Sequence, residues 1–90
     1  MTNKYIELVE KWLEDNNSVS KEELSYSNAS AMRGYSDATA AADAAFDAFN
    51  AAEAAAEAAE VVMYATEAAS EGNGDAGYWV KRYEEITNDK

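Results

Sequence analysis

The chain has 90 residues and a formal net charge of −11, and it contains no histidine, cysteine or proline. Without histidine or cysteine it cannot form a zinc, haem or iron–sulfur site, a disulfide, or a thiol or imidazole catalytic group. Its length allows one domain at most. Hydrophobic residues make up 48% of the chain, but almost half of them are alanine. The core must therefore be thin for a lone chain of this size, although alanine's helix propensity and the lack of proline still predict an all-α fold.

The first predicted helix covers about residues 4–16. Its apolar residues recur at helical spacing, and two asparagines follow where the helix should stop. The apolar positions are Tyr5, Ile6, Val9, Trp12 and Leu13.

The second predicted helix begins at Lys21. Ser20 and Glu23 have the spacing of a capping box, and Val19 and Leu24 occupy the two positions of a hydrophobic staple. Gly34 is the only interior residue that disfavours a helix, and a single glycine costs about 1 kcal/mol without ending one. We therefore predict one long helix over about residues 21–71, with a possible bend at Gly34 and a length of about 75 Å at 1.5 Å per residue.

A glycine-rich loop at residues 72–77 separates this helix from a third, short helix at about residues 78–87. Asp75 is a candidate N-cap, and Trp79, Val80, Tyr83 and Ile86 share one side of the short helix. The predicted architecture is a single helical domain over residues 1–90, hairpin-like, with two short helices flanking the long one.

Small residues recur along the long helix at alternating steps of three and four, which is the spacing of a coiled-coil seam. The two short helices would cover only about 35 Å of the 75 Å rod. We therefore expect the seam to pair with a second copy as a coiled-coil homodimer, most simply antiparallel. We name these positions the seam: Gly34, Ala38, Ala41, Ala45, Ala48, Ala52, Ala55, Ala59 and Val62. A parallel heptad line, in which large and small residues alternate, runs through Tyr35, Ala42, Phe49, Ala56 and Met63.

Acidic residues occupy the opposite side of the predicted rod. The segment 34–80 contains nine acidic residues and no basic one, so no lysine or arginine compensates them within that stretch. Such a face is usually solvated surface, but exposed faces normally mix both signs of charge. We name as the acidic band, and as candidate partner-binding residues, Asp43, Asp47, Glu53, Glu57, Glu60, Glu67 and Glu71.

An enzymatic role has little support. General acid–base catalysis needs a desolvated pocket that shifts a pKa, and the acidic band should be exposed. The loop 72–77 lacks the lysine and the following serine or threonine of a phosphate-binding P-loop, and Asn73 with Asp75 falls far short of an EF-hand. We predict no cofactor and no metal. Acidity also makes nucleic acid the least favourable direct partner.

Membrane and export signals are not evident. No run approaches the roughly 20 apolar residues of a membrane span, and no apolar signal region follows Met1. We expect a cytoplasmic protein without a membrane partner.

The two ends of the chain resemble a group of small, alanine-rich proteins of tailed bacteriophages of enteric bacteria. The resemblance covers about a third of the chain, and the middle matches by composition only. It is carried by Met1–Leu13, Ser18–Leu24 and Tyr78–Glu85. No activity is assigned to that group, so the resemblance supplies no site residues. It implies a context, the cytoplasm of the phage's host, in which small acidic phage proteins often disable restriction, recombination or CRISPR enzymes.

Two hypotheses follow. The first is a non-enzymatic protein that binds and inhibits or modulates a host protein, such as a nucleic-acid-binding defence enzyme with a basic surface, through a DNA-mimic-like acidic helix face. The density of charge limits this idea, because eight acidic residues over about 51 Å compare with one charge per ~1.7 Å in B-DNA. The alternative is a homo-oligomeric scaffolding coiled coil without a host target.

Overall fold

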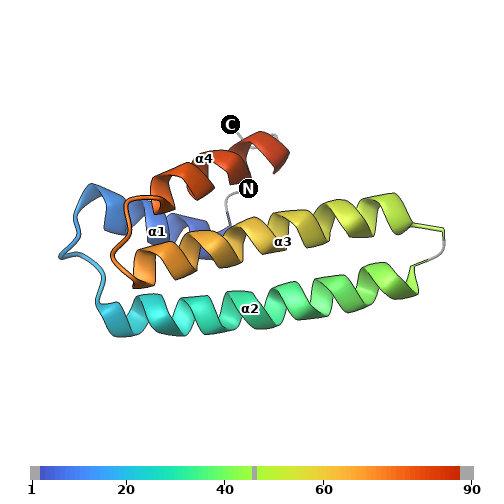
Figure 1. Cartoon of the computed structure of the whole chain (residues 1–90), viewed down its shortest axis with the longest axis horizontal. Coiled ribbons are helices and arrows are strands. Elements are labelled where there is room, and N and C mark those ends of the chain that lie inside the picture. The colour runs from blue at the N-terminus through green and yellow to red at the C-terminus, as the bar shows by residue number, and fades with distance from the viewer. Residues whose placement is uncertain (1–2, 46, 88–90) are drawn as a thin grey trace.

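The computed structural model describes residues 3–45 and 47–87, and the described residues form four helices and no strand (Figure 1). The helices are α1 (Lys4–Glu14), α2 (Lys21–Ala44), α3 (Phe49–Ser70) and α4 (Ala76–Thr87). The all-α prediction is confirmed. The two end helices lie close to their predicted bounds, with α1 ending two residues earlier and α4 beginning two residues earlier than expected.

The single long helix predicted over residues 21–71 is wrong. The chain reverses between Ala44 and Phe49, so that α2 and α3 form an antiparallel helical hairpin (Figure 1). The Thr66 hydroxyl lies 3.1 Å from the side-chain oxygen of Asn28, and the Tyr35 hydroxyl donates to Glu60 at 3.2 Å, which fixes the register of the two helices. The physical reason is burial: a lone rod leaves its small-residue side in water, whereas the hairpin covers much of it within one chain.

Gly34 does not bend the helix. α2 continues through Gly34, and a Cβ atom added there would meet no atom within 4 Å. Within the single chain, an alanine would therefore fit at position 34 without a clash.

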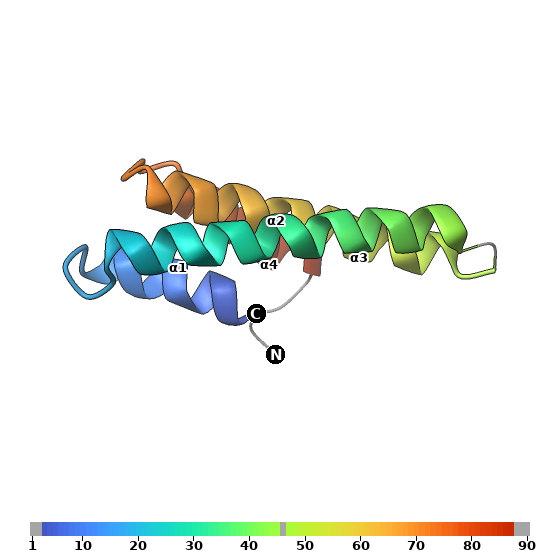
Figure 2. The same ribbon diagram turned by 90° about the horizontal axis from the view of Figure 1, so that it is seen from below.

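The two short helices pack on the hairpin at the end away from the α2–α3 turn (Figures 1 and 2). α4 and α1 each contact α3 and also contact each other, and α1 touches α2. The core lies where these four helices meet. Its most deeply buried side chains are Ile6, Val9, Leu24, Val62, Ala65, Thr66, Ala69 and Ala76.

Local signals begin and end the helices at this packed end. The Asn3 side chain accepts from the backbone N–H groups of Tyr5 and Ile6, and the Ser20 hydroxyl accepts from the Glu23 N–H at 3.1 Å. The predicted helix start at Lys21 is confirmed, but only this half of the predicted capping box is formed. Val19 and Leu24, the staple residues, are both buried.

The end of α3 is a Schellman motif, the usual glycine-containing helix C-terminus. Gly72 has φ 70°, its N–H donates to the carbonyl of Ala69 at 3.0 Å, and the N–H of Asn73 donates to the carbonyl of Ala68 at 2.8 Å. The glycine is required here because positive φ strains any residue with a Cβ atom. Gly72 therefore ends α3 at the start of the loop that the sequence predicted at residues 72–77.

The two glycines lead to opposite expectations for stability. We expect Gly34→Ala to raise the free energy of unfolding by about 0.5–1 kcal/mol, since alanine favours the helix and the added methyl group has free space. Gly72→Ala should lower it by about 1 kcal/mol, because its φ is positive. Urea unfolding followed by circular dichroism measures both, and a destabilised Gly34→Ala variant would contradict the packing described here.

Candidate functional site

Two heptad lines run through the predicted seam and continue beyond both of its ends, and the two lines have different surroundings. The inner line is buried or half-buried along its whole length, and it faces the partner helix of the hairpin, as the contact between Thr66 and Asn28 shows. Its members are Leu24, Ala31, Ala38, Ala45, Ala52, Ala59 and Thr66. Half of the predicted seam is thus used within one chain.

The outer line is buried only where the short helices cover it. Ser27, Val62 and Ala69 are buried. Four members toward the α2–α3 turn, the end of the hairpin that we call the free end, are exposed: Gly34, Ala41, Ala48 and Ala55. Gly34 and Ala55, where the exposed part begins, lie beside Tyr5 of α1 and Tyr83 of α4. The exposed part of the outer line is the portion of the predicted self-association surface that remains uncovered in the single chain.

The alternating line completes the contact between α2 and α3. Ala56 is buried, and Tyr35, Ala42 and Met63 are half-buried, whereas Phe49 beside the turn is 41% exposed. Residues from this line and from the inner line together give steps of three and four, so the hairpin contact has the spacing of a coiled-coil seam.

The acidic band no longer lies on one helix. Asp43 is in the last turn of α2, Asp47 is in the turn, Glu71 is the C-cap of α3, and the remaining four lie on α3. All of its members are exposed except Glu60, which is half-buried. Among the α3 residues, steps of three, four and seven keep the carboxylates on one side of that helix.

Two members of the band have partners that the sequence did not indicate. Glu57 lies 3.9 Å from the Arg82 guanidinium on α4, which also lies 3.8 Å from Glu85. Glu60 accepts from Tyr35 on α2. The side of α3 that bears the band is therefore flanked by α2 and α4. Both partners come from distant sequence positions, so helical periodicity alone gave no signal for them.

The free end of the hairpin has charge of one sign only. Between Gly34 and Glu60 there are six acidic residues and no basic residue. The basic residues Lys4, Lys11, Lys81 and Arg82 belong to α1 and α4, which pack at the other end (Figure 1). The fold thus separates an acidic end from an end of mixed charge.

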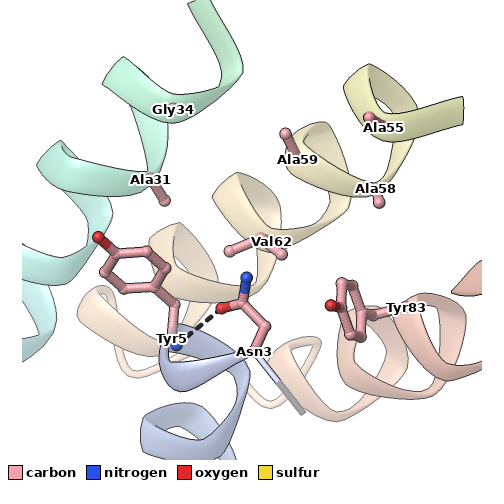
Figure 3. Close-up of a pocket in the computed structure, with 9 residues that line it drawn as sticks. All are labelled: Asn3, Tyr5, Ala31, Gly34, Ala55, Ala58, Ala59, Val62 and Tyr83. Carbon is pink, nitrogen blue, oxygen red and sulfur yellow. Dashed lines mark hydrogen bonds between the residues drawn. The ribbon is translucent and has the colours of Figure 1, made fainter. Parts of the chain in front are cut away.

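A shallow groove of about 280 Å³ lies at the step where α1 and α4 end against the hairpin (Figure 3). Tyr5 and Tyr83 line it from the two short helices, and small residues of α2 and α3 form the rest of its wall. None of the described residues that line it is acidic or basic. These residues are Asn3, Tyr5, Ala31, Gly34, Ala55, Ala58, Ala59, Val62 and Tyr83.

Aromatic side chains anchor α4. The rings of Trp79 and Tyr64 lie 4.9 Å apart between centroids, and Tyr78 packs edge-on against Trp79 at the same distance. Trp12 is buried in the core, whereas Tyr78 is 62% exposed. Most of these aromatic residues therefore serve packing between helices rather than forming a free recognition surface.

Residues 3–45 and 47–87 form neither a metal site nor a membrane-spanning helix. No three acidic side chains there lie close enough together to hold a metal ion. None of the helices in these ranges combines the length and apolarity needed to cross a membrane.

Comparison of the chain with protein-family models, with curated proteins and with solved structures finds no match in any of the three. The resemblance to small proteins of tailed bacteriophages has no support from these comparisons and stays an expectation from the sequence.

The contact between Tyr35 and Glu60 gives a pH-dependent prediction. The hydrogen bond to Glu60, together with its negative charge, raises the pKa of the Tyr35 phenol above its ordinary value of 10.0. The pair therefore stabilises the folded chain fully below that value, and this contribution is lost as the pH rises through the raised pKa.

We expect Tyr35→Phe to unfold more easily than the unsubstituted chain at neutral pH, and the difference to shrink in strongly alkaline solution. Urea unfolding over a pH series measures this difference. Tyr26→Phe, at a position 72% exposed, is the matched control and should give no such trend. A difference for Tyr35→Phe that stays constant with pH would show that the hydrogen bond does not contribute.

Proposed function

We propose that this chain is a non-enzymatic binding protein that presents the acidic free end of the α2–α3 hairpin to a basic surface of a host protein. The observation that supports this most is the run of six acidic residues without a basic residue between Gly34 and Glu60. Asp37, Asp43, Asp47 and Glu53 lie toward the α2–α3 turn, whereas Glu57 and Glu60 contact Arg82 of α4 and Tyr35 of α2.

Folding the rod into a hairpin concentrates the charge. Six carboxylates over a hairpin end about 20 Å long give roughly one charge per 3 Å, compared with one per ~1.7 Å in B-DNA. The density is about twice that of the extended rod. This supports a target whose basic surface normally binds nucleic acid, such as a defence enzyme of a phage host, and electrostatic steering would speed the association.

Not all members of the acidic band are equally available for binding. Glu57 is engaged by Arg82 and Glu60 by Tyr35, so reversing their charge would also disturb the fold. Asp43 and Glu53 are exposed, and neither side chain makes a hydrogen bond or ion pair with another described residue. They are the better positions for testing the proposed interface.

The test compares two double variants. Asp43→Lys with Glu53→Lys reverses charge at the free end of the hairpin, and Glu14→Lys with Glu84→Lys makes the same change in net charge at exposed positions of α1 and α4. Each immobilised protein is incubated with host lysate, and the captured proteins are eluted with duplex DNA.

We expect the unsubstituted chain and the α1/α4 variant to capture a nucleic-acid-binding protein that duplex DNA displaces. The hairpin variant should capture at least about tenfold less of that protein, because charges at the rim of an interface act on the rate of encounter and on its salt dependence. Circular dichroism confirms that each variant is folded. If both variants lose the captured protein equally, binding depends on net charge alone, and the proposal that the free end of the hairpin is the binding surface is contradicted.

A second candidate function is structural, a coiled-coil homodimer. The observation that favours it is the exposure of Gly34, Ala41, Ala48 and Ala55, small residues at heptad spacing that the chain itself leaves uncovered. Sedimentation equilibrium separates the candidates, because a scaffold self-associates without a host protein.

A further inference from the structure

The α2–α3 turn differs from the other two connections in how its helix ends are capped. The C-cap of α2 is Ala45, which is neither glycine nor asparagine and has a negative φ, and its N–H makes only a 3.3 Å bond to the carbonyl of Ala42. The N-cap of α3 is Ala48, which has no side-chain capping bond. By contrast, Asn3, Ser20 and Gly72 cap three other helix ends by specific bonds. Nothing local at Ala45 or Ala48 favours a turn over a helix.

The heptad register continues through this turn without interruption. The inner line passes from Ala38 to Ala45, Ala52 and Ala59 in steps of seven, and the alternating line passes from Ala42 to Phe49 and Ala56 in the same steps. A hairpin needs no phase relationship between its two helices, because the turn can rotate one against the other. A continuous helix does need it, since its seam must stay on one side.

The exposed outer line alone makes too small an interface for a stable dimer. α1 and α4 cover about half of the hairpin, which leaves roughly 18 Å of two helices, or about 360 Å² on each copy. Stable interfaces bury about 800 Å² per partner. Docking of two intact hairpins through this patch would therefore be weak, and a stable dimer has to use a larger surface.

We propose that two copies exchange halves by straightening the α2–α3 turn, so that α2 and α3 of each chain become one helix. The helix would run from residue 21 to residue 70 and measure about 75 Å. The α1–α2 half of one chain would then pack on the α3–α4 half of the other through the contacts that the single chain makes with itself. This rests on the homodimer proposed above and specifies how it forms.

The exchange keeps the existing contacts and changes mainly the turn. Tyr35 of one chain would donate to Glu60 of the other, and Asn28 would contact Thr66 in the same way. At the centre the two helices would meet through the inner and alternating lines, at Ala42, Ala45, Phe49 and Ala52. Because the contacts are equivalent in both forms, the preference of residues 45–48 for helix or turn decides between them.

Cross-linking between chains tests the exchange directly, because the chain has no cysteine of its own. A Tyr35→Cys chain and a Glu60→Cys chain are mixed in denaturant, refolded together at high concentration and high salt, and treated with a short bis-maleimide. Salt screens the repulsion between two acidic chains. We expect a dimer by size-exclusion chromatography and a cross-link between the two different chains.

The control replaces the Glu60→Cys chain with a Glu71→Cys chain, whose thiol lies about 16 Å further along α3 and should not react with position 35. A dimer without the 35–60 cross-link would overturn the exchange while leaving a homodimer in place. The absence of any dimer would overturn both.

Two matched variants test the role of the turn. Asp47→Ala should strengthen the dimer about fivefold, because alanine favours the straightened helix in both chains. Asp43→Ala removes the same charge at a residue that is helical in both forms, and should leave the dimer affinity unchanged beyond the effect of charge.

Asp47→Pro should weaken the dimer by about a hundredfold or more, because proline is disfavoured inside a helix. Ala45→Gly with Ala48→Gly should act in the same direction, and it keeps the test valid if the proline variant fails to fold. Equal effects of Asp47→Ala and Asp43→Ala, or an unweakened dimer in the glycine variant, would contradict the proposal.

Discussion

The antiparallel contact between α2 and α3 is the interaction on which the rest of the structure depends. It brings two alanine-rich helices close together, and most of its inner line consists of small side chains that bury little area each. Alanine supplies helix propensity and permits close approach, but each buried methyl group contributes far less than a leucine or isoleucine. The hairpin therefore needs α1 and α4, whose larger side chains complete the core at one end.

This division of roles explains why the molecule has two unlike ends. At the packed end, Ile6, Val9 and Leu24 are buried, and the side chains of Asn3 and Ser20 cap helix N-termini. At the free end, the outer line is exposed, acidic residues are not balanced by basic ones, and the turn lacks specific caps. The proposed binding surface and the proposed exchange both belong to this less stabilised end, where local opening should be easiest.

The fold determines where the acidic residues lie and which of them have partners within the chain. In the sequence it is a run of acidic residues on an alanine-rich segment, and in the structure Arg82 and Tyr35 engage two members of that run. Asp43 and Glu53 remain exposed at the free end, whereas Glu67 and Glu71 lie toward the packed end of α3. Some members of the acidic band thus make contacts within the chain, and others are exposed where a partner can bind.

The sequence by itself determined the helical class, the start of α2 at Lys21, the stop near Gly72 and the pairing of small residues at heptad spacing. These follow from local effects: capping by Ser20, positive φ at a glycine, and the propensity of alanine. Only the tertiary structure decided that the pairing occurs within one chain. Residues 45–48 contain no glycine, proline or asparagine, so local energies favour a continuous helix there. The reversal comes from burying α2 against α3, an energy that depends on residues as far apart as Asn28 and Thr66 and is absent from any local window.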